Sequence, residues 1–284
     1  RKTYPATVVT VAAGLGLALV NVTDSNFWEA SDAKVNMSAG TGIMGLGTTV
    51  VVPGFPTYGD LSLSLLESGV VGIKADSRSG DERYASFPRA VLALYPAISS
   101  DLIVGPVFGK STGNFEGFVS GSNGTVIPMQ TVVMFLESYK KDHAWHGSGT
   151  LGLILRPMEA GGLRKYWGLP DDGIGVQIRS VCKDSPLHSH VQKGDILVAV
   201  DNETIMADGA SIYRRSKDHK VMLPFQVLLG EKKPGDPTRF TIFRWALSGN
   251  HKNFTVTVRL NMLPALAPRA VDEITMHQPT YFIL

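Results

Sequence analysis

The chain has 284 residues, of which 44% are hydrophobic and 18% charged, and its formal net charge is +2. This composition excludes a disordered protein, which would hold fewer apolar and more charged residues. Lys and Arg are scattered along the chain, so no nucleic-acid partner is expected. The single cysteine, Cys182, excludes a disulfide scaffold and a zinc ribbon. We therefore expect a globular protein long enough for two domains, with no cofactor and no metal site.

An apolar run at residues 6–20 follows Arg1 and Lys2, which is the order of features in a signal peptide. The β-branched stretch Thr7–Val11 and the neighbouring glycines favour two short strands joined at Gly14 instead. The run is also shorter than the ~20 apolar residues that span a bilayer. We expect strands here and no transmembrane segment.

Short apolar runs separated by turn residues continue as far as residue 127. They lie at residues 48–52, 68–73, 90–94 and 117–119. The pair Asn123-Gly124 between two of the apolar segments is a strong signal for a β-hairpin. This pattern predicts an all-β barrel or sandwich. Pro128 then suits the first turn of an amphipathic helix whose apolar face ends before Lys140.

The second half of the chain mixes strands with short helices. The strands are expected at residues 175–181, 196–200 and 239–244. The composition predicts a β-rich domain at residues 1–142, a linker at 143–149, and a second domain at 150–260. The tail, residues 261–284, has three prolines and no clear period, so we expect it to be ordered only against another domain.

Two groups of motifs carry a family resemblance. The first group, at residues 50–71, resembles the second β-barrel of the HtrA/Deg serine proteases. It contains Pro53-Gly54-Phe55-Pro56, Gly59-Asp60 and Ser68-Gly69-Val70-Val71. The second group resembles a PDZ domain of the plant-type Deg branch. It consists of residues 149–153, Lys193-Gly194-Asp195-Ile196-Leu197 and Ala207-Asp208-Gly209. The resemblance implies a mainly β fold, in which a trypsin-like second barrel, with the first barrel missing or truncated, precedes an α+β PDZ domain. It also implies that the tail begins a possible second PDZ domain.

The resemblance allows the family's catalytic positions to be compared with this chain. Ile103 stands where the family has its nucleophilic serine, Asp101 replaces the first glycine of that motif, and Gly16 stands at the position of the triad aspartate. An alkyl side chain cannot attack a carbonyl, and a negative charge at Asp101 would oppose a developing oxyanion. Residues 1–142 also contain no histidine. These departures predict a pseudoprotease with no catalytic residue, and not an enzyme.

The alternative is an active serine endopeptidase, for which a shift of register would make Ser99 or Ser100 the nucleophile. Neither serine is followed by the glycine that the turn of the family motif needs. The Gly105-Pro106 pair also fits the end of that motif and fixes the register at Ile103.

Binding is the function that this interpretation leaves. PDZ domains take up an extended peptide as an added strand. The resemblance places the carboxylate-binding loop at Leu151-Gly152-Leu153, where Gly152 permits close approach of the peptide; alternatively, these are ordinary core and strand residues. It implies a structural or accessory protein-binding subunit of a multi-subunit assembly in an organelle, a mitochondrion in preference to a plastid. The alternative is a peptide-binding or holdase module that recognises peptide C-termini.

Overall fold

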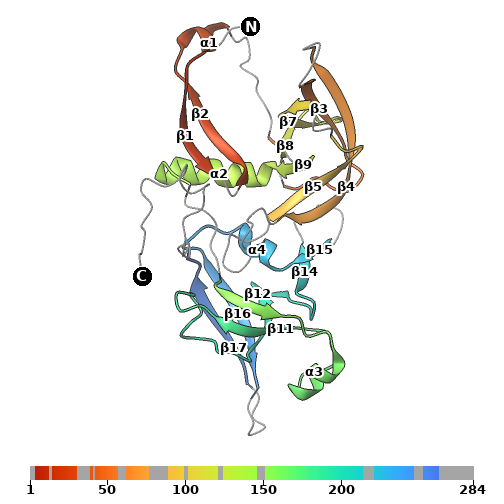
Figure 1. The fold of residues 1–284 in the computed structure, drawn as a ribbon, viewed down its shortest axis with the longest axis vertical. Helices are drawn as coiled ribbons and strands as arrows, with labels where there is room; N and C mark the ends of the chain where they lie inside the picture. Colours follow the sequence, from red (N-terminus) through yellow and green to blue (C-terminus); the bar gives the residue numbers. More distant parts are fainter. Residues whose placement is uncertain are drawn as a thin grey trace, which may run out of the picture.

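The computed structural model describes residues 4–12, 15–30, 39–40, 42–56, 62–76, 89–98, 102–120, 124–145, 151–213, 221–245 and 252–261. Two β-sheet units follow one another along the chain, one in the upper and one in the lower half of Figure 1. Two short helices, α1 (Ser25–Ala30) and α3 (Gly161–Tyr166), lie at opposite ends of the molecule in that view.

A closed seven-stranded sheet forms the upper unit. Its strands are β3 (Thr49–Pro56), β4 (Ser64–Asp76), β5 (Arg89–Tyr95), β6 (Leu102–Val104), β7 (Pro106–Gly109), β8 (Phe115–Ser120) and β9 (Thr125–Pro128). The order is β4-β5-β9-β8-β7-β3-β6, and a further pairing of β3 with β4 closes the sheet into a barrel. Side chains two residues apart point to the same side of a strand, and Val50, Val52 and Leu92 are fully buried inside. The expected barrel is therefore present.

The expected hairpin and helix at the end of the barrel are confirmed. Strands β8 and β9 pair antiparallel, with Phe118 opposite Ile127 and Val119 opposite Val126. Helix α2 (Met129–Asp142) begins directly after Pro128. Its apolar face packs against the barrel through Met129 and Val132, in a cluster with Phe115.

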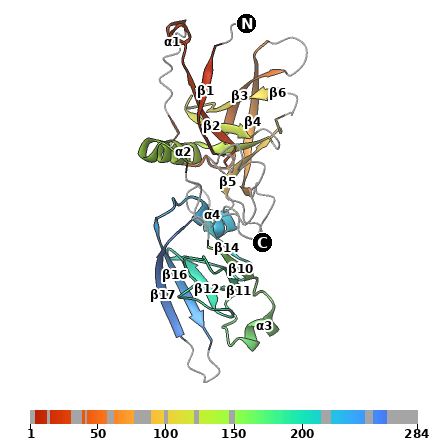
Figure 2. The ribbon, with the colours of Figure 1, turned by 60° about the vertical axis from the view of Figure 1, so that its left-hand side comes forward.

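The first two strands, β1 (Ala6–Ala12) and β2 (Leu17–Val22), form an antiparallel hairpin as expected. The hairpin is a two-stranded sheet of its own, separate from the barrel sheet. It packs on α2 instead, because Ala12 and Leu15 share a buried cluster with Phe135. Figure 2 shows the hairpin rising from α2 beside the barrel.

The lower unit is built on a six-stranded antiparallel sheet. Its strands are β10 (Leu153–Arg156), β11 (Val176–Val181), β12 (Ile196–Val200), β13 (Glu203–Thr204), β16 (Pro237–Arg244) and β17 (Lys252–Arg259). The order is β10-β11-β12-β16-β17, with β13 paired to β12. A second small sheet pairs β14 (Ala210–Tyr213) with β15 (Val221–Pro224), which leads into helix α4 (Gln226–Gly230). The strands expected in this half are confirmed.

Helix α4 joins the two units. Val227 is fully buried in the core of the barrel together with Leu223, whereas Phe225 and Leu229 belong to the core of the lower sheet. An ion pair, Lys233 Nζ to Glu137 Oε2 at 2.9 Å, also joins the lower unit to α2. The division at residues 143–149 remains a prediction, since residues 146–150 and 262–284 lie outside the described part of the chain.

Candidate peptide-binding site

Strand β10 lies at one edge of the lower sheet. Among the described strands, β10 pairs with β11 on one side and with no strand on the other. Leu153 lies opposite Val181, and Arg156 lies opposite Gln177. An edge strand offers backbone N–H and C=O groups to a further strand. The geometry therefore allows an extended peptide to be added alongside β10.

The loop that leads into β10 is held by hydrogen bonds to the segment after β11. The Ser185 hydroxyl donates to the carbonyl oxygen of Leu151 at 2.5 Å and accepts from the backbone N–H of Leu187 at 3.1 Å. The N–H of Cys182 donates to the carbonyl oxygen of Gly152 at 2.8 Å. Gly152 has φ +60°, a conformation that favours glycine. The start of the edge strand is thus fixed before any peptide arrives.

The two leucines of the predicted carboxylate loop have different environments. Leu151 is 3% exposed and is a member of the core of the lower sheet, as the alternative interpretation expected. Leu153 is half-buried and packs against the same core. Leu228 of α4 also packs against this core. Apolar side chains from β10 and α4 therefore pack against the same core, and carboxylate binding by the loop remains a prediction.

A buried ion pair holds the turn between β11 and β12. Asp195 is 1% exposed, and Arg244 donates to it through Nε at 2.8 Å and Nη2 at 2.7 Å. The hydrogen bond to Asp195 raises the pKa of Arg244 above its usual value, which keeps the guanidinium charged. Asp195 also accepts from the N–H of Gln192 at 2.8 Å. The sequence motif at residues 193–197 is therefore a structural brace for the sheet.

The positions predicted to replace the family's catalytic residues lie on different sheets. Ile103 is in β6, where its backbone pairs with Phe55 of β3. Gly16 has φ +66° and precedes β2 of the hairpin. Asp101, Ser99 and Ser100 lie outside the described residues. The roles of these positions therefore remain predictions.

Neither a metal-binding cluster nor a membrane-spanning helix is present among the described residues. They contain no group of three or more His, Cys, Asp and Glu side chains arranged to hold a metal ion. Within the same residues, no helix has both the length and the apolar character needed to cross a membrane.

The same order of a β-barrel and a second β-sheet unit is found in a solved structure. AlgW, an HtrA-type protease solved with a tripeptide, aligns with a TM-score of 0.57 at 18% identity, over 92% of this chain and 78% of its own. The expected fold, a trypsin-like barrel followed by a PDZ domain, is thereby confirmed.

Sequence relatives extend along nearly the whole chain. Putative protease Do-like 3, mitochondrial, from Arabidopsis thaliana is 28% identical over 94% of this chain. Protease Do-like 2, chloroplastic, from the same plant is 27% identical over 100% of it. The chain spans about half the length of these relatives, 45% and 44% respectively. No protein-family model matches. In sequence and in fold, the chain is therefore similar to proteases of the HtrA/Deg family.

The comparisons contradict the expectation that the chain is not an enzyme, because the sequence relatives are named proteases and AlgW is an HtrA-type protease. That expectation depended on the identity of Ile103, Asp101 and Gly16 in one assumed register. Single side chains decide a catalytic role only together with the geometry around them.

Sequence reasoning missed two features of this region. The hydrogen bond of Ser185 to Leu151 was not predicted from the sequence. A serine or threonine directly before a proline and after an aspartate, as in Asp184-Ser185-Pro186, is a local turn signal that could have indicated it. The packing of α4 against the barrel has no such local signal, since Val227 looks like any apolar helix residue.

Proposed function

We propose that this chain binds extended polypeptides as an added strand along β10, as the peptide-binding part of an HtrA/Deg-family protein. The open edge of β10, beside a loop already fixed by hydrogen bonds, carries the proposal. Because the loop is preorganised, little conformational entropy is lost when the peptide binds. The leucines of β10 and α4 suit apolar side chains of the peptide.

The proposal includes a protein assembly in an organelle. The names of the relatives, mitochondrial in one case and chloroplastic in another, support an organelle without choosing between the two. Large apolar side chains on the first hairpin and α1 are exposed, with Val8 at 65% and Trp28 at 60%. Exposed apolar side chains that gather in one region favour a protein partner. A purified chain that sediments as a monomer and binds no apolar dye would count against this part of the proposal.

Replacing Gly152 by Trp is expected to abolish peptide binding. A bulky side chain at this loop would both strain the backbone at φ +60° and block close approach of a peptide end. The probe is a pool of random decapeptides with a free carboxyl terminus and a final Leu, Val or Phe, followed by fluorescence anisotropy. The unmodified chain should bind with a dissociation constant in the range of roughly micromolar.

The matched control is Gly173→Trp. Gly173 has a similar backbone conformation, φ +68°, and no atom within 4 Å of an added Cβ. Both variants therefore introduce the same side chain with comparable backbone strain, and only Gly152 lies at the start of β10. Equal loss of binding in the two variants, at equal thermal stability, would contradict the proposed site.

A second candidate function is serine endopeptidase activity, which the protease names of the relatives favour. The test is a fluorophosphonate probe, followed by mass spectrometry of the labelled peptide. Labelling at Ser99 or Ser100 that is lost in the corresponding Ala variant would support proteolysis. Absence of labelling at any serine under conditions that label trypsin would leave peptide binding as the function.

A further inference from the structure

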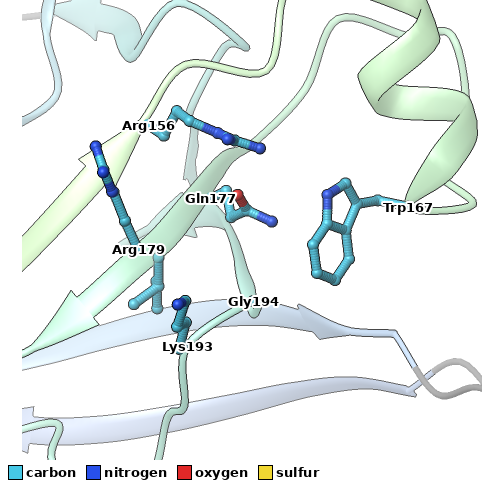
Figure 3. A pocket seen from close by; sticks show the side chains of 7 residues that line it. Arg156, Trp167, Gln177, Arg179, Lys193 and Gly194 are labelled. Carbon is cyan, nitrogen blue, oxygen red and sulfur yellow. The ribbon is translucent and has the colours of Figure 1, made fainter.

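A second candidate site lies on the other face of the PDZ sheet. A cavity of about 480 Å³ opens there, and six of the residues that line it are labelled in Figure 3. They are Arg156, Trp167, Gln177, Arg179, Lys193 and Gly194. A volume of this size is typical of a small-molecule site. We refer to it as the basic pocket.

The alternation of side chains along β11 turns Gln177 and Arg179 away from the core that α4 shares. Val176 and Ile178 belong to the core that contains Leu229 of α4. Gln177 lies between these two residues and Arg179 follows Ile178, so the side chains of Gln177 and Arg179 point to the opposite face. Ile196, which pairs with Gln177, packs in a different cluster with Trp167. The pocket also includes Ile178 of β11 and Arg156 of the edge strand β10, so it lies beside the peptide edge.

The pocket carries positive charge without neutralising partners. Arg156, Arg179 and Lys193 are exposed, and none forms an ion pair with another residue in the described part of the chain. The carboxylate nearest to Lys193 in sequence is Asp195, and both of its oxygens accept hydrogen bonds from Arg244. Three cations around one cavity repel one another, and an anion between them would relieve that repulsion.

The buried amide of Gln177 is an independent sign of a ligand. Gln177 is 6% exposed, and its Nε2 atom is buried without a hydrogen-bond partner. Buried polar groups in proteins nearly always have a partner, because leaving one unpaired is costly. Figure 3 shows the Gln177 amide among the side chains of Arg156, Trp167 and Lys193. A ligand oxygen in the cavity would accept its hydrogen bond.

Trp167 provides the apolar wall of the pocket. Its ring is half-buried and packs edge-to-face against Tyr166 and Trp245, with centroid distances of 5.5 and 5.9 Å. It also covers Gly194, where an added Cβ would lie 3.3 Å from the ring. The indole is therefore held in place, with part of its surface available to a planar group.

We propose that the basic pocket binds a small phosphate ester that carries a planar ring. Guanidinium groups match phosphate oxygens with paired N–H donors, and Arg156 and Arg179 provide two of them. Lys193 adds a third charge, and the Gln177 amide adds a neutral donor deeper in the cavity. The ring of the ligand packs on Trp167. The named polar side chains can all donate hydrogen bonds, which selects an anion over a cation.

The test is isothermal titration of the full chain with AMP, inorganic phosphate and adenosine at low salt. AMP is expected to bind with a dissociation constant below about 1 mM, more tightly than phosphate, and adenosine should show no measurable binding. Raising the salt concentration should weaken AMP binding, since Arg156, Arg179 and Lys193 are exposed. Phosphate binding equal to AMP binding would identify free phosphate as the ligand and would overturn the ring contact.

Three variants locate the binding. Arg156→Gln and Arg179→Gln should each weaken AMP binding by about tenfold, because a charge-assisted hydrogen bond is lost. Gln177→Glu should abolish it, because a carboxylate replaces the buried donor. Arg239→Gln is the matched control, since Arg239 is an exposed strand arginine outside the pocket, and it should leave binding unchanged. The proposal is overturned if neither AMP nor phosphate binds below about 5 mM, or if the Arg156→Gln/Arg179→Gln double variant, folded by circular dichroism, binds normally.

Discussion

Replacing Gly117 by Ala is expected to destabilise the barrel by roughly 3–5 kcal/mol. Gly117 has φ +147°, and an added Cβ would lie 2.1 Å from the carbonyl oxygen of Ile127. It would also lie 3.2 Å from the Cα atom of Pro128. These are backbone atoms of β9, the strand that pairs with β8. The contact cannot be relieved by a side-chain rotation, so the two strands would have to separate.

The measurement is urea denaturation followed by circular dichroism, with Gly47→Ala as the control. Gly47 also has a positive φ, +81°, but no atom lies within 4 Å of an added Cβ. The control variant should therefore be destabilised only by its strained backbone conformation, by about 1–2 kcal/mol. A similar shift of the denaturation midpoint in the two variants would show that β8 and β9 do not approach as closely as the structure describes.

Replacing Arg164 by Met is expected to destabilise the PDZ domain by about 2–4 kcal/mol. Arg164 is 3% exposed and donates to the carbonyl oxygens of Pro170 at 2.6 Å and Ile174 at 3.0 Å. It also pairs with Asp172 at 2.7 Å. Methionine would fill most of the volume but would leave the carbonyl acceptors unpaired. The Asp172 side chain is 43% exposed and would regain water, so the loss comes mainly from the carbonyls.

This substitution should also loosen the segment that carries Trp167, which directly follows α3. The measurement is hydrogen exchange in the variant and in the unmodified chain. The substitution is expected to speed the exchange of residues 158–174 more than that of β16. The exposed residue Arg239 again provides a control, since Arg239→Met should change stability by less than about 0.5 kcal/mol. Unchanged exchange in Arg164→Met would contradict a bracing role for this arginine.

Local sequence signals were sufficient to predict much of the fold. The Asn-Gly pair predicted the β8–β9 hairpin, in which Ser120 pairs with Thr125, and Pro128 marked the start of α2. Both features depend on residues close together in the chain. The family motifs predicted the order of barrel and PDZ domain, which AlgW confirms.

Features that depend on distant contacts were not predicted. The first hairpin packs on α2 outside the barrel sheet, and α4 inserts Val227 into the barrel core. The basic pocket joins Arg156 to Gln177 through the strand register, and Lys193 through the turn before β12. These side chains are ordinary surface or strand residues in the sequence, and only the register of the sheet brings them together.

The catalytic prediction failed for a related reason. The prediction of inactivity depended on which residues stand at single positions such as Ile103. Catalytic function depends instead on the arrangement of several groups. Similarity to named proteases is a property of the whole alignment, which extends over nearly the whole chain. The peptide-binding prediction depends instead on backbone geometry at Leu151–Leu153, which the structure describes.

Hydrogen exchange of the β10 backbone with and without bound peptide tests the central claim most directly. A saturating decapeptide selected from the random pool should slow exchange of the amides at residues 153–156, because their outward groups would pair with the added strand. The same peptide with an amidated C-terminus should protect these amides less at equal concentration. Peptide binding with unchanged exchange at residues 153–156, or with protection confined to other strands, would contradict strand addition at β10.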